Sequence, residues 1–95
     1  MKVQELLATP EKWTKGAWAR DNNGKLVAAP KGEAWDLEGA IFYCYPGKKA
    51  HWYLKLVQGY INKFHKHLPR DLAEFNDSNE IKFEDIRKII NKLDL

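Results

Sequence analysis

One stretch of this chain repeats like an amphipathic helix over four turns, and it constrains the fold more than any other feature. Its apolar residues recur at spacings of three, four and seven until Pro69 ends the pattern. They are Tyr53, Val57, Tyr60, Ile61, Phe64 and Leu68. A helix of this length is stabilised mainly by what covers its apolar side, so the sequence predicts a core built around it.

Three further helices are indicated by similar spacing. A short first helix ends where Thr9 meets Pro10, because proline breaks a helix interior. In the second, Gly39 and Ala40 carry almost no side chain, so another element can approach closely there. The last begins after the polar loop 76–80. The three helices are expected at residues 3–7, 35–44 and 83–93.

Residues 16–29 have a different pattern, with two short apolar runs around Asn22, Asn23 and Gly24. These three residues accept the positive φ angles of tight turns, which predicts a β-hairpin. We therefore expect a mainly α fold: a small four-helix domain with an N-terminal β-hairpin as its minor β component. A chain of 95 residues supports one core, so residues 1–95 are expected to form a single domain.

The composition fits this fold class. Hydrophobic residues make up 44% of the chain, enough for a core without metal or disulfide, and the lone Cys44 excludes an internal disulfide. The first residues lack the apolar run of a signal peptide, so we expect a cytoplasmic protein and no membrane partner. The side chains expected in the core are Trp13, Leu37, Ile41, Tyr53, Val57, Tyr60, Ile61, Phe64, Ile86 and Ile90.

Charge is distributed unevenly along the chain. From Lys48 to Arg70 there is no carboxylate, and this stretch holds six of the 16 Lys and Arg residues and all three histidines. Residues 71–95 instead carry seven acidic and four basic groups. A local excess of positive charge indicates an anionic partner better than the net charge of +3 does.

The basic stretch coincides with the long helix, whose polar side is expected to combine lysines with an exposed Trp52. Such a strip can dock an acidic protein, and lysines around an exposed ring can also hold single-stranded nucleic acid. The competing interpretation is an ordinary solvated helix face, which needs no partner. The candidate partner-binding residues are Lys48, Lys49, Trp52, Lys55, Lys63 and Lys66.

No motif assigns a reaction, a metal or a cofactor. His65 and His67 would point apart on a helix, and Cys44 has no partner at zinc-like spacing, so no metal site and no cofactor are expected. Cys44 also lies on an apolar helix face, where a cysteine is usually an inert small hydrophobe. We therefore expect no catalytic residue and no enzyme activity.

Four pieces of the sequence occur in an order typical of a known family. They are a Leu-Leu helix leading into Pro10-Glu-Lys-Trp13-Thr-Lys-Gly16, then Ala19-Arg20-Asp-Asn-Asn-Gly24, then Trp35-Asp-Leu-Glu-Gly39-Ala40-Ile41, and finally Phe75-Asn76-Asp77 with Phe83-Glu-Asp-Ile86. Together they resemble the small bacterial and phage family known as domain of unknown function 6197. The resemblance implies an architecture and a bacterial or phage setting, but no reaction. Asp36 departs from it, because a cysteine often occurs there, and Ile81-Lys82 replaces an Arg-Thr pair.

Two functions stay open at this point. The first is a non-enzymatic binding module that docks an anionic surface on the basic helix, with a protein as the favoured partner, nucleic acid as the alternative and inhibition of a host factor as one role. The second is a small-ligand-binding protein or enzyme that uses Asn76 and Asp77 together with the Trp13 to Arg20 region. The same two residues fit a turn whose side chains bond nearby backbone amides, which is the structural interpretation.

Overall fold

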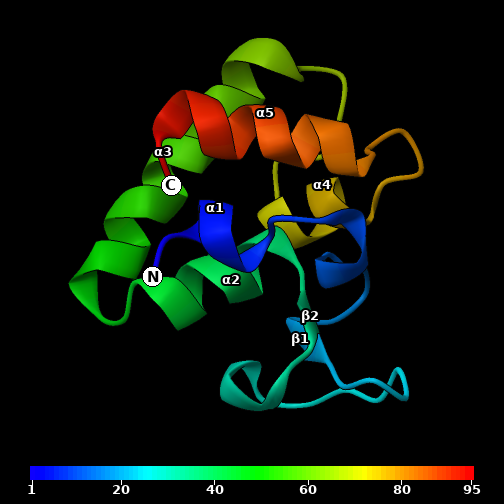
Figure 1. Cartoon of the computed structure of the whole chain (residues 1–95). Coiled ribbons are helices and arrows are strands. Elements are labelled where there is room, and N and C mark those ends of the chain that lie inside the picture. The colour runs from blue at the N-terminus through cyan, green and yellow to red at the C-terminus, as the bar shows by residue number, and fades with distance from the viewer.

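The computed structural model describes residues 1–95 and is mainly helical, as the sequence predicts (Figure 1). Two short 3-10 helices and two short strands occupy the region between the first two α-helices. In chain order the elements are α1 (Val3–Leu6), η1 (Pro10–Lys12), β1 (Ala19–Arg20), η2 (Ala29–Lys31), β2 (Ala34–Trp35), α2 (Leu37–Cys44), α3 (Lys48–Phe64), α4 (Leu72–Asp77) and α5 (Phe83–Leu93).

Helix α2 lies at the centre of the fold, and α1, α3 and α4 all pack against it. Asp36 begins α2 as its N-cap, since its Oδ1 accepts a 2.6 Å hydrogen bond from the Gly39 amide. A Cβ atom on Gly39 would lie 2.2 Å from the Trp18 carbonyl oxygen. The close approach predicted at Gly39 is thus present, and it is made by the chain just before β1.

The longest helix, α3, follows α2 after a turn at Gly47, which has a φ of 72°. Its predicted apolar stripe is correct over most of its length, because Val57 and Ile61 are fully buried. The predicted C-terminal extent is wrong: α3 ends at Phe64 and not at Leu68, and His65 leaves the helical conformation.

The early end of α3 also corrects part of the predicted core. Leu37, Ile41, Val57, Ile61, Ile86 and Ile90 are fully buried as expected. Trp13, Tyr53 and Tyr60 are half-buried against that core. Phe64, however, is 53% exposed, because it belongs to the last turn and lies against the Tyr60 ring at 4.6 Å instead of under another element.

The β component forms differently from the predicted hairpin. The turn lies where expected, since the Asp21 amide donates to the Lys25 carbonyl and Gly24 has a φ of 80°. The antiparallel partner of β1 is β2, with Ala19 opposite Trp35, and only an isolated bridge joins Arg20 to Leu26. The small sheet therefore connects β2, just before α2, to β1, just before the turn.

The structure adds one helix to the four predicted. Asp71 caps α4 by accepting a 3.1 Å hydrogen bond from the Glu74 amide. This six-residue helix includes Asn76 and Asp77, which the sequence analysis placed in a loop. It packs against α2, so its last turn lies beside the start of that central helix.

Candidate functional site

The solvent side of α3 carries the basic residues singled out in the sequence. Lys48, Lys55 and Lys63 are exposed, and at 100° per residue they lie within about one-fifth of a turn of one another. Trp52 falls within the same sector and is 59% exposed, as predicted. We call Lys48, Trp52, Lys55 and Lys63 the basic face.

Two other candidate residues lie off this face. Lys49 is exposed but is turned about 100° from Lys48 around the helix. Lys66 is exposed too, yet it lies beyond the end of α3, so its predicted alignment with Lys48 and Lys55 is wrong. The early helix end also removes the helical geometry assumed for His65 and His67.

The cations of the basic face have no anionic partner within the protein. The structure has two ion pairs, Lys2 with Asp94 at 2.9 Å and His67 with Glu80 at 3.3 Å. Neither involves α3, which contains no acidic residue. The face therefore projects uncompensated positive charge into solvent.

A glycine lies in the middle of the basic face. Gly59 is exposed, one turn from both Lys55 and Lys63, and a Cβ atom placed on it would meet nothing within 4 Å. A glycine inside a helix costs stability, and no contact within the protein requires this one. Its absent side chain leaves backbone open between two lysines, where another molecule can approach closely.

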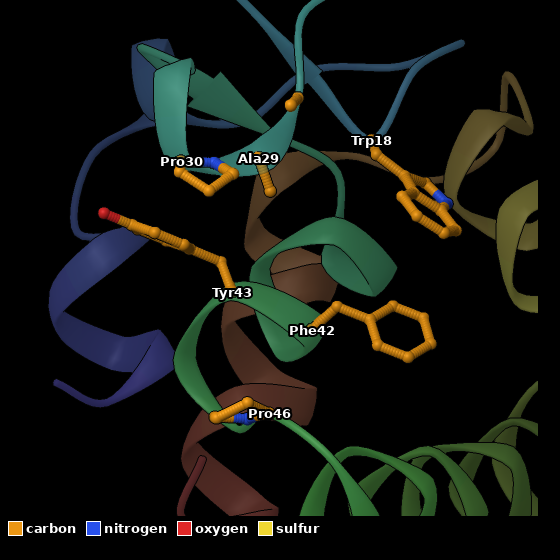
Figure 2. Close-up of a pocket in the computed structure, with 7 residues that line it drawn as sticks. Trp18, Ala29, Pro30, Phe42, Tyr43 and Pro46 are labelled. Carbon is orange, nitrogen blue, oxygen red and sulfur yellow. The ribbon is translucent and has the colours of Figure 1, made fainter.

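An apolar groove opens beside the N-terminal half of α3, between η2 and the C-terminal end of α2 (Figure 2). Its volume is about 640 Å³, within the range of ligand pockets. The side chains around it are almost entirely apolar. They are Trp18, Ala28, Ala29, Pro30, Phe42, Tyr43 and Pro46.

Sequence reasoning missed this groove, although one signal for it was present. Phe42 and Tyr43 are neighbours on a short helix and so point about 100° apart, which prevents both from entering one core. The Tyr43 ring stacks on Trp35 at 5.7 Å, whereas the Phe42 ring turns toward Trp18 at 5.2 Å. The groove lies between these two aromatic pairs.

The second predicted region is brought together around the Asn76 side chain. Asn76 is fully buried, and its Oδ1 accepts hydrogen bonds from Trp13 Nε1 at 2.7 Å and from the Leu37 amide at 3.1 Å. Its Nδ2 donates to the Thr14 carbonyl and to Asp77 Oδ1, both at 3.1 Å. All four hydrogen-bonding positions of the amide are thus used.

Polar groups next to Asn76 also connect residues 15–16 to residues 77–81. Asp77 Oδ1 also accepts from the Gly16 amide at 2.9 Å. Lys15 Nζ donates to the carbonyls of Ser78 and Ile81 at 2.7 and 3.0 Å. Asn76 and Asp77 do bond backbone amides, but those of distant segments and not of their own turn. A ligand-binding role here stays a prediction.

Asp36 is the most perturbed carboxyl group near this network. Burial raises its pKa to about 7, the nearby charges of Glu38 and Asp77 act in the same direction, and the Gly39 amide opposes them. Asp36 thus caps α2, although burial disfavours the charged form of its carboxyl group. A carboxyl group with a pKa of about 7 changes its protonation state around neutral pH.

Other chemistry-bearing groups are not assembled into a centre. Burial raises the pKa of Cys44 to about 11, so at neutral pH it is a protonated thiol. No three His, Cys, Asp or Glu side chains are close enough to share a metal ion. His65 lies edge-on to the Phe75 ring at 5.1 Å.

The family assignment follows from a match over nearly the whole chain. Residues 1–93 match the model of the Family of unknown function (DUF6197). The chain belongs to this family. The comparisons find no match among curated proteins and none among solved structures.

Two positions where this chain differs from what the resemblance led us to expect have clear local roles in this DUF6197 member. Asp36, in place of a cysteine, is the N-cap of α2. Lys82, whose side chain has no hydroxyl group, is the N-cap of α5, and its backbone amide donates a 2.9 Å hydrogen bond to Asp85 Oδ2. No helix of the protein is both long enough and apolar enough to serve as a membrane span.

Proposed function

We propose that this protein is a non-enzymatic binding module that docks an acidic surface of a partner protein on the basic face of α3. The observation that carries the proposal is the set of three exposed lysines on one side of a helix without any acidic residue or ion pair. Unpaired cations of one sign steer oppositely charged partners and fix their orientation.

The dimensions of the basic face suit a protein interface. Lys63 follows Lys48 by fifteen positions, which is roughly 22 Å along a helix. Trp52 provides an exposed ring among the lysines, and tryptophan is enriched among residues that dominate binding energy. Gly59 lets the partner approach the helix backbone between Lys55 and Lys63.

The surroundings favour a protein over nucleic acid. The apolar groove adjoins the basic face, since the ring of His51 on α3 contacts the Phe42 ring at 6.4 Å. An acidic protein can supply carboxylates and apolar side chains to the two areas together. A nucleic acid supplies phosphates to the lysines, but the polar edges of its bases would lose hydration in a groove with an almost entirely apolar lining.

As part of the same proposal, we place the protein in the cytoplasm of a bacterial cell, encoded by the bacterium or by a phage. In the phage case, docking would occupy the acidic surface of a host protein and inhibit it. A photo-crosslinking residue in place of Trp52 should then join the protein to one defined host component. The same residue at exposed Asn91 on α5 should not.

Binding to two anionic polymers tests the docking proposal directly. Poly-L-glutamate should bind at low ionic strength, where the Debye length is ~30 Å, and should weaken as salt is added. The double variant Lys55→Glu/Lys63→Glu should lose about tenfold or more in affinity. The control Lys88→Glu/Lys92→Glu makes the same charge change at exposed positions of α5 and should lose far less.

A single-stranded oligonucleotide is the competing probe. If it binds with a log–log salt slope near −2, about −0.7 for each of three lysines, while polyglutamate does not bind, the partner is nucleic acid and protein docking is wrong. Equal losses in the two double variants would also contradict the proposal, because binding would then follow net charge and not the basic face.

A further inference from the structure

A row of aromatic side chains links the apolar groove to the basic face. Trp18 is 53% exposed, and the centroid of its ring lies 5.2 Å from that of Phe42. The Phe42 ring centroid lies in turn 6.4 Å from that of His51, edge to face. His51 precedes Trp52 on α3, so aromatic groups run from the groove to the first turns of the basic face. A bound segment can therefore leave the groove and meet lysines without crossing a polar gap.

The lining of the groove determines what it can accept. Two prolines, three aromatic side chains and two alanines surround it, and proline nitrogen cannot donate a hydrogen bond. The one indole donor at its edge is already used, because Trp18 Nε1 donates to Glu38 Oε1 at 2.7 Å. Apart from the Tyr43 hydroxyl, the lining offers no free side-chain hydrogen-bonding group, so a polar small molecule would lose most of its hydration without replacement, whereas an apolar side chain would gain from burial.

Positive charge borders the groove at two places. Lys31 directly follows Pro30 in η2, and Lys48 and Lys49 come shortly after Pro46 at the start of α3. All three lysines are exposed, and none takes part in an ion pair. An occupant with carboxylates on both sides of its apolar group would match this arrangement.

We propose that the groove receives one aromatic or large aliphatic side chain of an acidic partner segment, whose flanking carboxylates lie on the basic face and beside Lys31. This inference rests on the proposed function and deepens it, because it names the recognition element of the partner: an apolar anchor within a run of acidic residues. Trp18 and Phe42 hold the anchor, and the lysines set the direction of the chain.

Two blocked heptapeptides of equal charge test this inference. Each has six glutamates, and the central residue is phenylalanine in one and serine in the other. Titration at low salt, followed by NMR, should show the phenylalanine peptide binding roughly tenfold tighter, the factor expected from burying much of one aromatic side chain. The indole NH resonance of Trp18 should shift with the phenylalanine peptide and much less with the serine peptide.

A neutral substitution inside the groove provides the control. Ala28 is exposed and lines the groove, so Ala28→Gln should fill it without changing charge and should abolish the advantage of the phenylalanine peptide. Ala8→Gln, the same change at an exposed alanine that does not line the groove, should preserve the advantage. Serine-peptide binding should be equal in the wild type and both variants.

The outcomes separate the groove from the basic face. If both peptides bind equally well, or if Ala28→Gln keeps the tenfold difference, the groove proposal is wrong while docking on the basic face stands. If dodecanoate shifts the Trp18 resonance and the phenylalanine peptide has no advantage, the groove holds a lipid chain and the peptide anchor is overturned. If neither peptide binds, both proposals fail.

Discussion

Trp13 Nε1 donates a 2.7 Å hydrogen bond to Asn76 Oδ1, which joins the segment before the small sheet to the last turn of α4 across 63 residues of sequence. The same oxygen accepts the Leu37 amide at the start of α2. One buried amide thus holds three segments together, and removing it leaves their donors and acceptors without partners.

Asn76→Ala should therefore lower the free energy of unfolding by about 2 to 4 kcal/mol, because the indole NH, the Leu37 amide and the Thr14 carbonyl would lose buried partners. Urea denaturation measures the loss. Asn79→Ala, at an exposed position three residues later, should change stability by no more than about 0.5 kcal/mol. Similar small effects at both positions would show that Asn76 is not a structural link.

Two glycines of the chain predict opposite effects for the same substitution. Gly39→Ala should destabilise the protein by about 2 kcal/mol or more, because the new methyl group would meet the Trp18 carbonyl at 2.2 Å. Gly59→Ala should stabilise it by about 0.5 to 1 kcal/mol, because its surroundings are open and alanine favours a helix. Thermal unfolding of both variants checks the signs, and a destabilised Gly59→Ala would contradict this view of the basic face.

Sequence periodicity predicted the helical framework because the apolar stripes of α3 and α5 are long. Val57, Ile61, Ile86 and Ile90 recur at helical spacing and are fully buried. The end of α3 was harder to place, since Leu68 continues the same spacing after the helix has ended. Where a helix stops depends on which segments cover its last turn, and that information is not local.

The features that depend on distant contacts were not predictable in this way. Three of the four partners of Asn76 lie 39 to 63 residues away, so its polar character indicated a turn and not a buried link. Strands of two residues carry little pattern of their own, which hid the pairing of β1 with β2. The groove combines three segments, and only the adjacent Phe42 and Tyr43 gave a local indication of it.

Asp36 should make stability depend on pH in an unusual direction. Its pKa is about 7 in the folded protein against 3.8 ordinarily, so between these values the folded state binds more protons than the unfolded state. This group therefore contributes a loss of stability as pH rises from about 4 to about 7. Asn can cap α2 without a charge, so Asp36→Asn should remove that loss.

Unfolding free energies of wild type and Asp36→Asn, measured across this range, isolate the effect from the other carboxyl groups. Relative to the wild type, the variant should gain about 2 to 4 kcal/mol between pH ~4 and pH ~8. Parallel curves for the two proteins would mean that Asp36 ionises normally in the folded state.

The two phenylalanines at the ends of α3 and α4 test how the chain leaves the long helix. Phe75 is fully buried against His65, so Phe75→Ala should cost about 3 to 5 kcal/mol. Phe64, which sequence spacing assigned to the core, is 53% exposed, and Phe64→Ala should cost only about 1 kcal/mol or less. Chemical denaturation compares the two directly. A loss at Phe64 as large as that at Phe75 would mean that α3 continues toward Leu68 in solution and buries its last turn.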